Sequence, residues 1–346
     1  MQHRIWSRFL TLATLVIVLT FIGGTVINAQ DSCFGLAQAD CDILNAANDN
    51  MANVTSFTYD LSADLSVGGM GVLAMFAPGL PAAMSFSVES DGVFDGGNEA
   101  AQIVFDINAE VGAESAAATG TLFLVDQVVY LIAEDGRAYG VKPEDMDTSD
   151  LGVDMESLDM TEMTESVNMD AFTSMFTDLG MDPNQYTTFA RLDDVEMMGQ
   201  TMYPFEFTMD IDALLNSPEF MEVIGALAGV TADDPSMAGV MEMVPALLAG
   251  IQSELSMTEY IGADGYMHGI SLAFDFGVDL SSLFGPSEPI EITLTLDMGM
   301  DNLNSAPAVS APGDVTMLSE DEATAMLTDM FSEFETLFAG LGEMMP

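Results

Sequence analysis

The feature that most constrains the fold of this chain is a repeated alternation of apolar and polar residues. In FTYDLSADLSV, residues 57–67, every second residue is apolar, and the residues between are Thr, Asp and Ser. The same alternation recurs in residues 103–111, 203–210, 271–280 and 292–300, and more briefly in 84–90. Such alternation is typical of antiparallel strands with one dry and one solvated face, whereas parallel strands buried on both faces are continuously apolar. The pattern predicts a large antiparallel sheet.

Turn signals separate these segments and complete the predicted sheet. They are SDG at 90–92, DGG at 95–97, EDG at 134–136 and ADG at 263–265. Residues 121–132, TLFLVDQVVYLI, are almost continuously apolar, so this segment is predicted to be a strand covered on both faces. Because the polar residues of the other segments are rich in Asp and Glu, we expect a curved sheet with an acidic convex face.

Helical periodicity is confined to a few segments. A first helix is predicted over 41–53 and a pair over 211–227 and 237–251. Residues 319–346 form a predicted C-terminal amphipathic helix, in which Ser319 and Glu322 have the spacing of a capping box. Its apolar stripe is Leu327, Met330, Phe331, Phe334, Phe338 and Leu341. The Met- and acid-rich residues 143–185 are predicted to be a helix-containing insertion that covers the sheet. The predicted fold class is α+β, a half-open barrel of antiparallel strands with helices over its concave face.

The first 29 residues have the layout of a secretory signal peptide. Arg4 and Arg8 precede an apolar run from Leu10 to Ile22, which is shorter than the roughly 20 residues that span a bilayer, and Ala29 supplies a small residue for cleavage. An uncleaved anchor is the alternative. We therefore expect an exported protein in an extracellular, periplasmic or cell-envelope location, with its main domain over residues 30–318.

Cys33 and Cys41 are the only cysteines of the chain. Gln30, Asp31 and Ser32 precede Cys33, which does not fit the small apolar motif that directs lipid modification. Export implies an oxidising compartment, so the two cysteines are predicted to form a disulfide that closes a short loop. Free or lipidated thiols remain the alternatives.

The charge balance excludes some partners. The chain has 56 Asp and Glu against 5 Lys and Arg, and a formal net charge of −51. Nucleic acid is excluded as a partner because binding to phosphates needs clustered Lys and Arg, and an anionic membrane surface would repel the chain. Repulsion between so many carboxylates predicts a salty, calcium-containing or acidic medium.

Signals for metal binding or catalysis are weak. Residues 145–156, DMDTSDLGVDME, place Asp145, Asp147, Ser149 and Glu156 at the ligand positions of an EF-hand loop, but Asp150 stands where that loop needs Gly. Diffuse, weak Ca²⁺ binding by surface carboxylates is the preferred interpretation. HGISLA at 268–273 has only the letters of a nucleophile elbow, because Ser271 lies in an alternating strand. No catalytic residue and no cofactor are predicted.

The order of these segments resembles the LolA-like superfamily, especially the LppX, LprA, LprF and LprG lipid-binding lipoproteins. The resemblance rests on a helix leading into SFTYDLSADLSV, on VVYLIAEDGRAYGV before the insertion, and on YIGADGYMHGISLAFDF and ITLTLDMGMDNLNSAPAVSAPGDV after it. Residues 199–214 resemble the strand-to-helix passage of the family, and 260–264 its aromatic turn. Asp301, Asn304 and Pro312 resemble its closing segment.

The resemblance implies a non-enzymatic carrier that holds a lipid or another hydrophobic small molecule between the concave sheet face and a helical lid. Flexible Met side chains would let such a lid adapt to its ligand. The candidate ligand-binding residues are Phe57, Tyr59, Leu61, Phe86, Phe105, Phe205, Phe207, Phe274, Phe276, Leu294 and Leu296 on the sheet, and Met237 and Met241 on the lid. The alternative is an acidic structural or interaction protein of the envelope, with a solid core, an envelope protein partner and weak Ca²⁺ binding.

Overall fold

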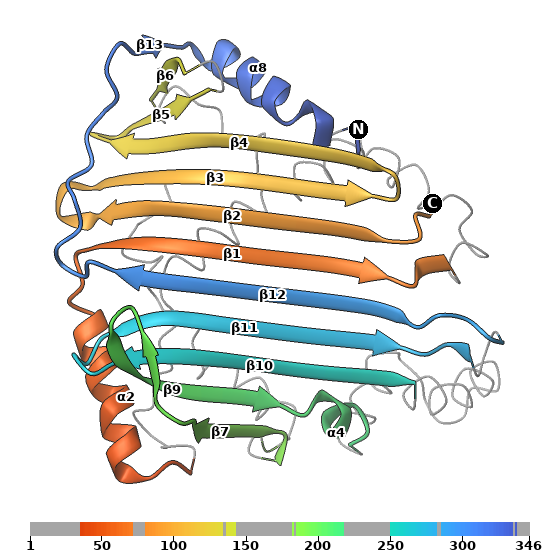
Figure 1. Cartoon of the computed structure of the whole chain (residues 1–346). Helices are drawn as coiled ribbons and strands as arrows, with labels where there is room; N and C mark the ends of the chain where they lie inside the picture. The colour runs from red at the N-terminus through yellow and green to blue at the C-terminus, as the bar shows by residue number, and fades with distance from the viewer. Residues whose placement is uncertain are drawn as a thin grey trace, which may run out of the picture.

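The computed structural model describes residues 35–71, 80–133, 136–142, 182, 185–217, 250–281, 285–334 and 336–337. A single 13-stranded sheet forms most of this part of the chain (Figure 1), in the order β13-β6-β5-β4-β3-β2-β1-β12-β11-β10-β9-β7, and β8 pairs with β9. The strands are β1 (Ser56–Gly68), β2 (Met84–Asp95), β3 (Ala100–Val111), β4 (Glu114–Val125), β5 (Val128–Ile132), β6 (Ala138–Val141), β7 (Thr187–Arg191), β8 (Val195–Met197), β9 (Gln200–Met209), β10 (Ile251–Gly262), β11 (Met267–Val278), β12 (Ile290–Asp301) and β13 (Thr316–Met317). The helical elements are α2 (Gln38–Met51), η2 (Gly96–Asn98), α4 (Ile211–Leu215) and α8 (Glu320–Met330).

Two meanders lie side by side in the sheet. The strands β1 to β6 follow one another across one half, β9 to β12 across the other, and β12 pairs with β1 between them. Only the two-residue β13 is parallel to its neighbour, β6, among the described pairings. The sheet does not close, because β13 and β7 stand at opposite edges. The predicted fold class, α+β with a large, open antiparallel sheet, is confirmed.

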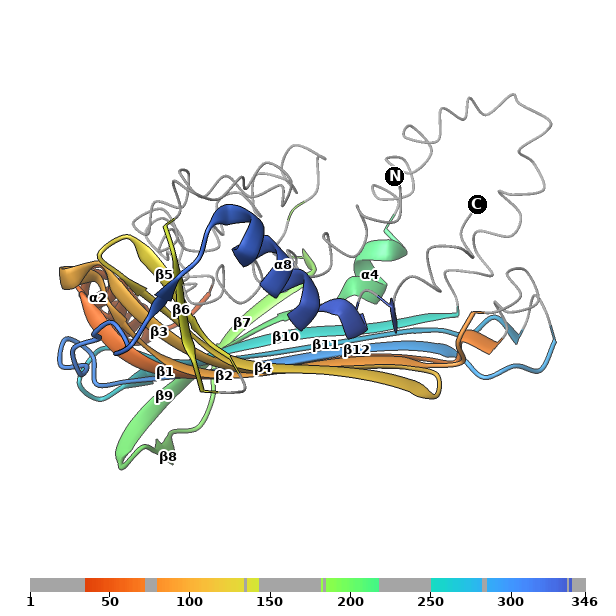
Figure 2. The ribbon, with the colours of Figure 1, turned by 90° about the horizontal axis from the view of Figure 1, so that it is seen from above.

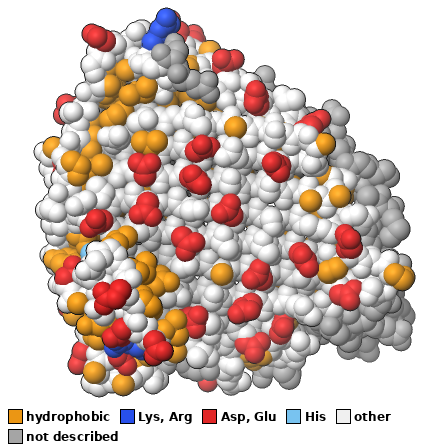
Figure 3. Space-filling model, viewed as in Figure 1, with side chains coloured by type: hydrophobic (Ala, Val, Ile, Leu, Met, Phe, Trp, Pro, Cys, Tyr) orange, Lys and Arg blue, Asp and Glu red, His pale blue; other side chains and the backbone are white. Residues whose placement is uncertain are grey.

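The alternation of the sequence sorts the side chains between two faces, which we call the inner and the outer face. On the inner face, Leu61 of β1 lies opposite Ser90 of β2 and Met298 of β12, and on the outer face Asp60 lies opposite Asp91. Figure 2 shows α4 and α8 on one side of the sheet, the inner side, and β8 on the other. Figure 3 shows the outer face, where Asp and Glu side chains are spread over the central strands.

In the described part of the chain, helical segments pack on the inner face near both edges of the sheet. Leu44 and Ala47 of α2 pack against Phe189, Phe205 and Ile261 from β7, β9 and β10. Near the other edge, the segment that continues α8 places its buried Phe334 and Leu337 on the alanines of β3 and β4, which are Ala109, Ala116 and Ala118. These small side chains let the helical segment approach the sheet closely.

The predicted segments 57–67, 84–90, 103–111, 203–210, 271–280 and 292–300 all lie largely within strands, namely β1, β2, β3, β9, β11 and β12. The first helix is confirmed as α2. The capping box is also confirmed, because Glu322 Oε2 accepts hydrogen bonds from the Ser319 backbone N–H at 2.9 Å and from its hydroxyl at 2.8 Å.

Several predictions were wrong in detail. Residues 121–132 are not one strand: β4 ends at Val125, Asp126 and Gln127 turn with φ values of 51° and 58°, and β5 follows. Positive φ at both central residues is the geometry of a tight hairpin turn, which the apolar flanks concealed. The SDG at 90–92 is no turn either, because it lies inside β2, where Ser90 is buried opposite Leu61.

The middle of the chain differs most from the prediction. The helix predicted over 211–227 ends at Leu215 as α4, and residues beyond Ser217 lie outside the described residues. Most of the helix predicted over 237–251 also lies outside them, but Ile251 already begins β10, which no pattern had predicted. The inner face of β10 carries the polar Ser253 and Glu259, and these two residues break the apolar alternation.

Candidate functional site: the apolar inner face

All predicted ligand-binding residues of the sheet lie on its inner face, as the strand register shows. They belong to successive rows of directly opposed side chains that run across the strands. One row, which we call the open row, consists of Phe86, Leu65, Leu294, Phe274, Leu255 and Met209 from β2, β1, β12, β11, β10 and β9. The predicted Met237 and Met241 lie outside the described residues.

Burial changes along the strands of this face. At the end near α2, Leu61, Met298 and Ile270 face one another and are 3–4% exposed. Four residues further along β1, Leu65 is 36% exposed. Its neighbours Phe86, Leu294 and Phe274 in the open row are only half-buried. The inner face is therefore a packed core at one end and a partly accessible apolar surface at the other.

Aromatic rings make up much of this accessible end. Phe274 and Phe276, two residues apart on β11, lie with their ring centroids 6.3 Å apart and an interplanar angle of 18°. Phe276 is opposite Ile292 of β12, in the row next to the open row. Covering such side chains with an apolar ligand is favourable, by roughly 25 cal/mol for each Å² that is removed from water.

Polar groups on the inner face are concentrated at the packed end. The Tyr59 and Ser90 hydroxyls lie 3.2 Å apart and are buried together. Burial raises the pKa of Tyr59 to about 12, against the smaller lowering effect of its hydrogen bond to Ser90. Glu259 is 1% exposed between Ile270 and Phe205. Glu259 alternates in phase with the apolar Leu255 and Met257, which indicates the inner face, but a charged residue is not expected there.

Arg191 ties the first helix to the edge of the sheet. Its Nη1 donates to Asp40 Oδ1 of α2 at 2.9 Å, and its Nη2 donates to Asp194. The guanidinium also lies over the ring of Tyr203, 4.5 Å from the centroid. Although burial lowers the Arg191 pKa, these two carboxylates more than compensate and raise it above its ordinary value. Arg191 is thus a structural cation at the packed end.

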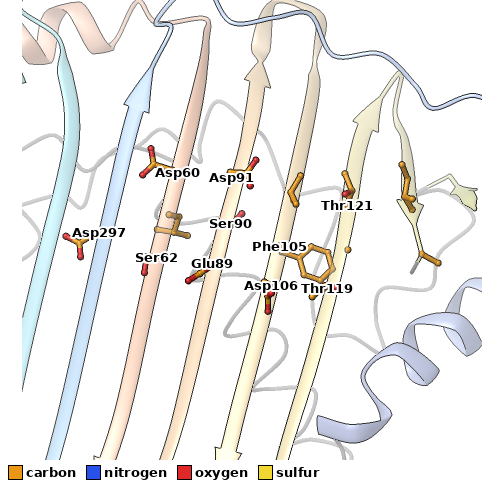
Figure 4. Close-up of a pocket in the computed structure, with 15 residues that line it drawn as sticks. Asp60, Ser62, Glu89, Ser90, Asp91, Phe105, Asp106, Thr119, Thr121 and Asp297 are labelled. Carbon is orange, nitrogen blue, oxygen red and sulfur yellow. The ribbon is translucent and has the colours of Figure 1, made fainter. Parts of the chain in front are cut away.

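Two grooves in the described part of the chain lie on the other side of the sheet. The larger, of about 630 Å³, crosses β12, β1, β2, β3 and β4 and is lined on the outer face by Asp60, Glu89, Asp91, Asp106 and Asp297 (Figure 4). A smaller one, of about 280 Å³, is lined mostly by Ser, Thr and acidic side chains. Asp60 is directly opposite Asp91, and Glu89 is directly opposite Asp106. Like charges in these positions repel one another.

The described residues contain no group of three or more His, Cys, Asp or Glu placed to hold a metal ion. The predicted EF-hand residues Asp145, Asp147, Ser149 and Glu156 lie outside the described part of the chain. Ser271 lies inside β11, opposite Asp297 and Thr258, so it is not on the strand-to-helix turn of a nucleophile elbow. The buried His268 makes a 3.1 Å contact from Nδ1 to the Met300 carbonyl oxygen.

The N-terminal predictions are only partly visible. Cys41 is 1% exposed on α2 and carries no free thiol, whereas Cys33 lies outside the described residues, so their disulfide remains a prediction. Residues 1–29 and nearly all of 143–185 are also outside the described part. Within that part, no helix combines the length and the apolar character needed to cross a bilayer.

No protein-family model and no curated protein matches the chain. Among solved structures, LprF from Mycobacterium bovis matches with 12% identity over 80% of this chain and 98% of that chain, with a TM-score of 0.36. Lipoprotein LppX from Mycobacterium tuberculosis matches with 12% identity over 80% and 100%, with a TM-score of 0.31. A putative outer membrane lipoprotein-sorting protein domain from Vibrio parahaemolyticus matches with 7% identity over 74% and 88%, with a TM-score of 0.15. All three TM-scores are below 0.5 and all three identities are below 25%.

Proposed function

We propose that this chain is an exported, non-enzymatic carrier or binding protein for a lipid or another hydrophobic molecule. The ligand would lie against the open row and the neighbouring Phe276 on the inner face. The observation that supports this proposal is the burial gradient of that face. A sheet that only needed a core would bury its large apolar side chains throughout, but here Leu65 is 36% exposed and Phe274 is half-buried.

The proposal includes an extracellular, periplasmic or envelope location without a lipid anchor, and a disulfide between Cys33 and Cys41. The apolar leader and the three polar residues before Cys33 support it. The lid over the ligand would include residues of the 143–185 insertion and the Met237 and Met241 segment, whose Met side chains can adapt to ligands of different shape.

The test is saturable uptake of the uncharged fluorescent probe diphenylhexatriene by delipidated protein. Phe274→Asn places an amide in the open row and should weaken uptake about tenfold, which corresponds to about 1.4 kcal/mol. Asp275→Asn is the matched control, because Asp275 is the next residue of β11 and faces the outer side, opposite Glu254 and Thr293. Absence of saturable uptake by the native chain, or an equal effect of both variants, would contradict the proposal.

A second candidate function is a structural or interaction protein of the envelope whose acidic face binds Ca²⁺ weakly. The observation in its favour is the groove of about 630 Å³ on the outer face, in which Asp60 and Asp91 are directly opposed carboxylates. Calcium-dependent self-association or partner binding, measured by light scattering with Mg²⁺ as the control, together with no uptake of diphenylhexatriene, would favour it over the carrier.

A further inference from the structure

The scarcity of cations limits the kind of ligand that the inner face can accept. The whole chain has 5 Lys and Arg, and Arg4 and Arg8 belong to the predicted leader. Arg137, Lys142 and Arg191 are the remaining three. The anionic head group of a fatty acid or phospholipid loses hydration when it binds and must regain that free energy from a cation or from several hydrogen-bond donors.

Of these three, Arg191 is the one that lies within a strand, on the inner face opposite Phe205. Its two Nη atoms already donate to Asp40 and Asp194, and its guanidinium stacks on Tyr203. These contacts hold it at the α2 end of the sheet, where the inner face is packed. An anionic ligand would have to compete with two carboxylates for this group.

Arg137 and Lys142 flank β6, which is next to the β13 edge of the sheet and is separated from β2 by β5, β4 and β3. Both are exposed, and both already interact with other parts of the chain. The four spacings from β6 to β2, at about 4.8 Å each, are together larger than the roughly 10 Å over which charges act at moderate salt.

The charged groups described near the open row are acids. Asp212 of α4 accepts hydrogen bonds through Oδ1 from the Ser253 backbone N–H at 3.1 Å and from its hydroxyl at 3.0 Å, and Ser253 lies one row from Leu255. Behind the sheet, the outer face carries Asp64 next to Leu65 and Asp275 next to Phe274. The summed field of a chain with a net charge of −51 therefore opposes an anion at this site.

We infer that the inner face selects against anionic head groups and takes amphiphiles whose polar end is uncharged or cationic. This inference rests on the proposed carrier function and deepens it by naming the ligand class. The apolar rows supply affinity for any acyl chain, and the charge distribution decides which head group can accompany that chain into the site.

The experiment compares dodecanol, dodecylamine and dodecanoate as competitors of diphenylhexatriene at pH about 8, where a carboxylic acid of ordinary pKa, about 4, is ionised. At low salt, dodecanoate should compete at least about tenfold less well than dodecanol, and dodecylamine at least as well as dodecanol. The penalty on dodecanoate should shrink in 1 M NaCl, where the Debye length falls to about 3 Å.

A variant tests the same inference from the side of the protein. Leu65→Lys places a cation in the open row at a position that is already 36% exposed, and Leu65→Gln is its uncharged control. The Lys variant should improve competition by dodecanoate several-fold relative to dodecanol, and the Gln variant should not. If the probe is taken up saturably but dodecanoate competes with it as well as or better than dodecanol does, the inference is overturned and the proposed function is not. Absence of saturable uptake would overturn the proposed function and the inference with it.

Discussion

At the scale of single residues, Tyr59 makes the packed end of the inner face sensitive to alkali. Its phenol is 5% exposed beside the Ser90 hydroxyl, and burial raises its pKa to about 12 from an ordinary 10.0. The neutral phenol therefore contributes stability that is fully present below pH 10 and is lost as the pH rises through 12. We expect the native chain to lose about 2 to 3 kcal/mol of unfolding free energy over this window, since one pKa unit corresponds to 1.36 kcal/mol.

Tyr59→Phe should remove most of this alkaline loss. At neutral pH it should cost only about 1 kcal/mol, because the buried Ser90 hydroxyl loses its partner. Chemical denaturation at pH 7 and at pH 11, where about half of the alkaline loss is expected, measures both effects. An identical alkaline loss in the native chain and the variant would show that Tyr59 is not the group responsible.

Arg191 gives a second prediction at this scale. Arg191→Met keeps the length of the side chain but leaves Asp40, whose side chain is 23% exposed, without the cation that contacts it at 2.9 Å. We expect a loss of about 1 to 3 kcal/mol of unfolding free energy, more than for an exposed surface pair and less than for a fully buried one. The control is Arg137→Met, which changes an exposed cation next to β6, near the opposite edge of the sheet, and it should cost less. Equal losses would mean that Arg191 acts only through the net charge.

At the scale of elements, the start of α8 depends on the capping box. The Ser319 backbone and hydroxyl hydrogen bonds lower the pKa of Glu322 below its ordinary 4.5. The contribution of this carboxylate to stability is therefore fully present above pH 4.5 and is lost as the pH falls through the lower, folded value. The protection of α8 amides against hydrogen exchange, relative to their intrinsic exchange rates, should fall below that pH in the native chain. Glu322→Gln should remove this acid-dependent step, whereas Asp321→Asn should keep it.

The elements also show what the sequence could and could not predict. Strands β1, β3 and β12 were predictable because every inner position holds an apolar side chain and most outer positions hold a polar one. Strand β10 was missed because Glu259 and Ser253 occupy inner positions and Tyr260 an outer one, so that tertiary contacts rather than hydropathy set its faces. The turn at Asp126 and Gln127 was missed because positive φ at these residues leaves little trace between apolar flanks.

The candidate site was predictable in one respect only. Alternation placed Phe86, Phe274 and Leu294 on a common face, but no local pattern could show that they are directly aligned across four strands or that burial decreases toward them. The alanines under the α8 segment carry a similar lesson, because Ala116 and Ala118 are too small to mark β4 as an inner-face strand by hydropathy.

At the scale of the whole molecule, the open sheet and the charge are linked. Edge strands offer unpaired backbone groups to other chains, and here the two edges are the five-residue β7 and the two-residue β13. Short edges and a net charge of −51 both oppose edge-to-edge association. The same charge also opposes folding, because folding brings carboxylates such as Asp60 and Asp91 directly opposite each other.

The stability of this chain should therefore rise with salt. Between 0.1 and 1 M NaCl the Debye length falls from about 10 Å to about 3 Å, which screens repulsion between carboxylates on neighbouring strands, so the thermal midpoint should increase. Asp91→Asn removes one partner of a directly opposed pair and should add about 0.5 kcal/mol at low salt while flattening the salt dependence. Glu288→Gln removes one charge from an exposed position before β12 and controls for the change in net charge. Calorimetry of the three chains at both salt concentrations measures the effect.

A midpoint that does not depend on salt would mean that repulsion between the carboxylates of the outer face does not affect stability. An equal gain in both variants would mean that the repulsion comes from the overall charge rather than from the opposed pairs.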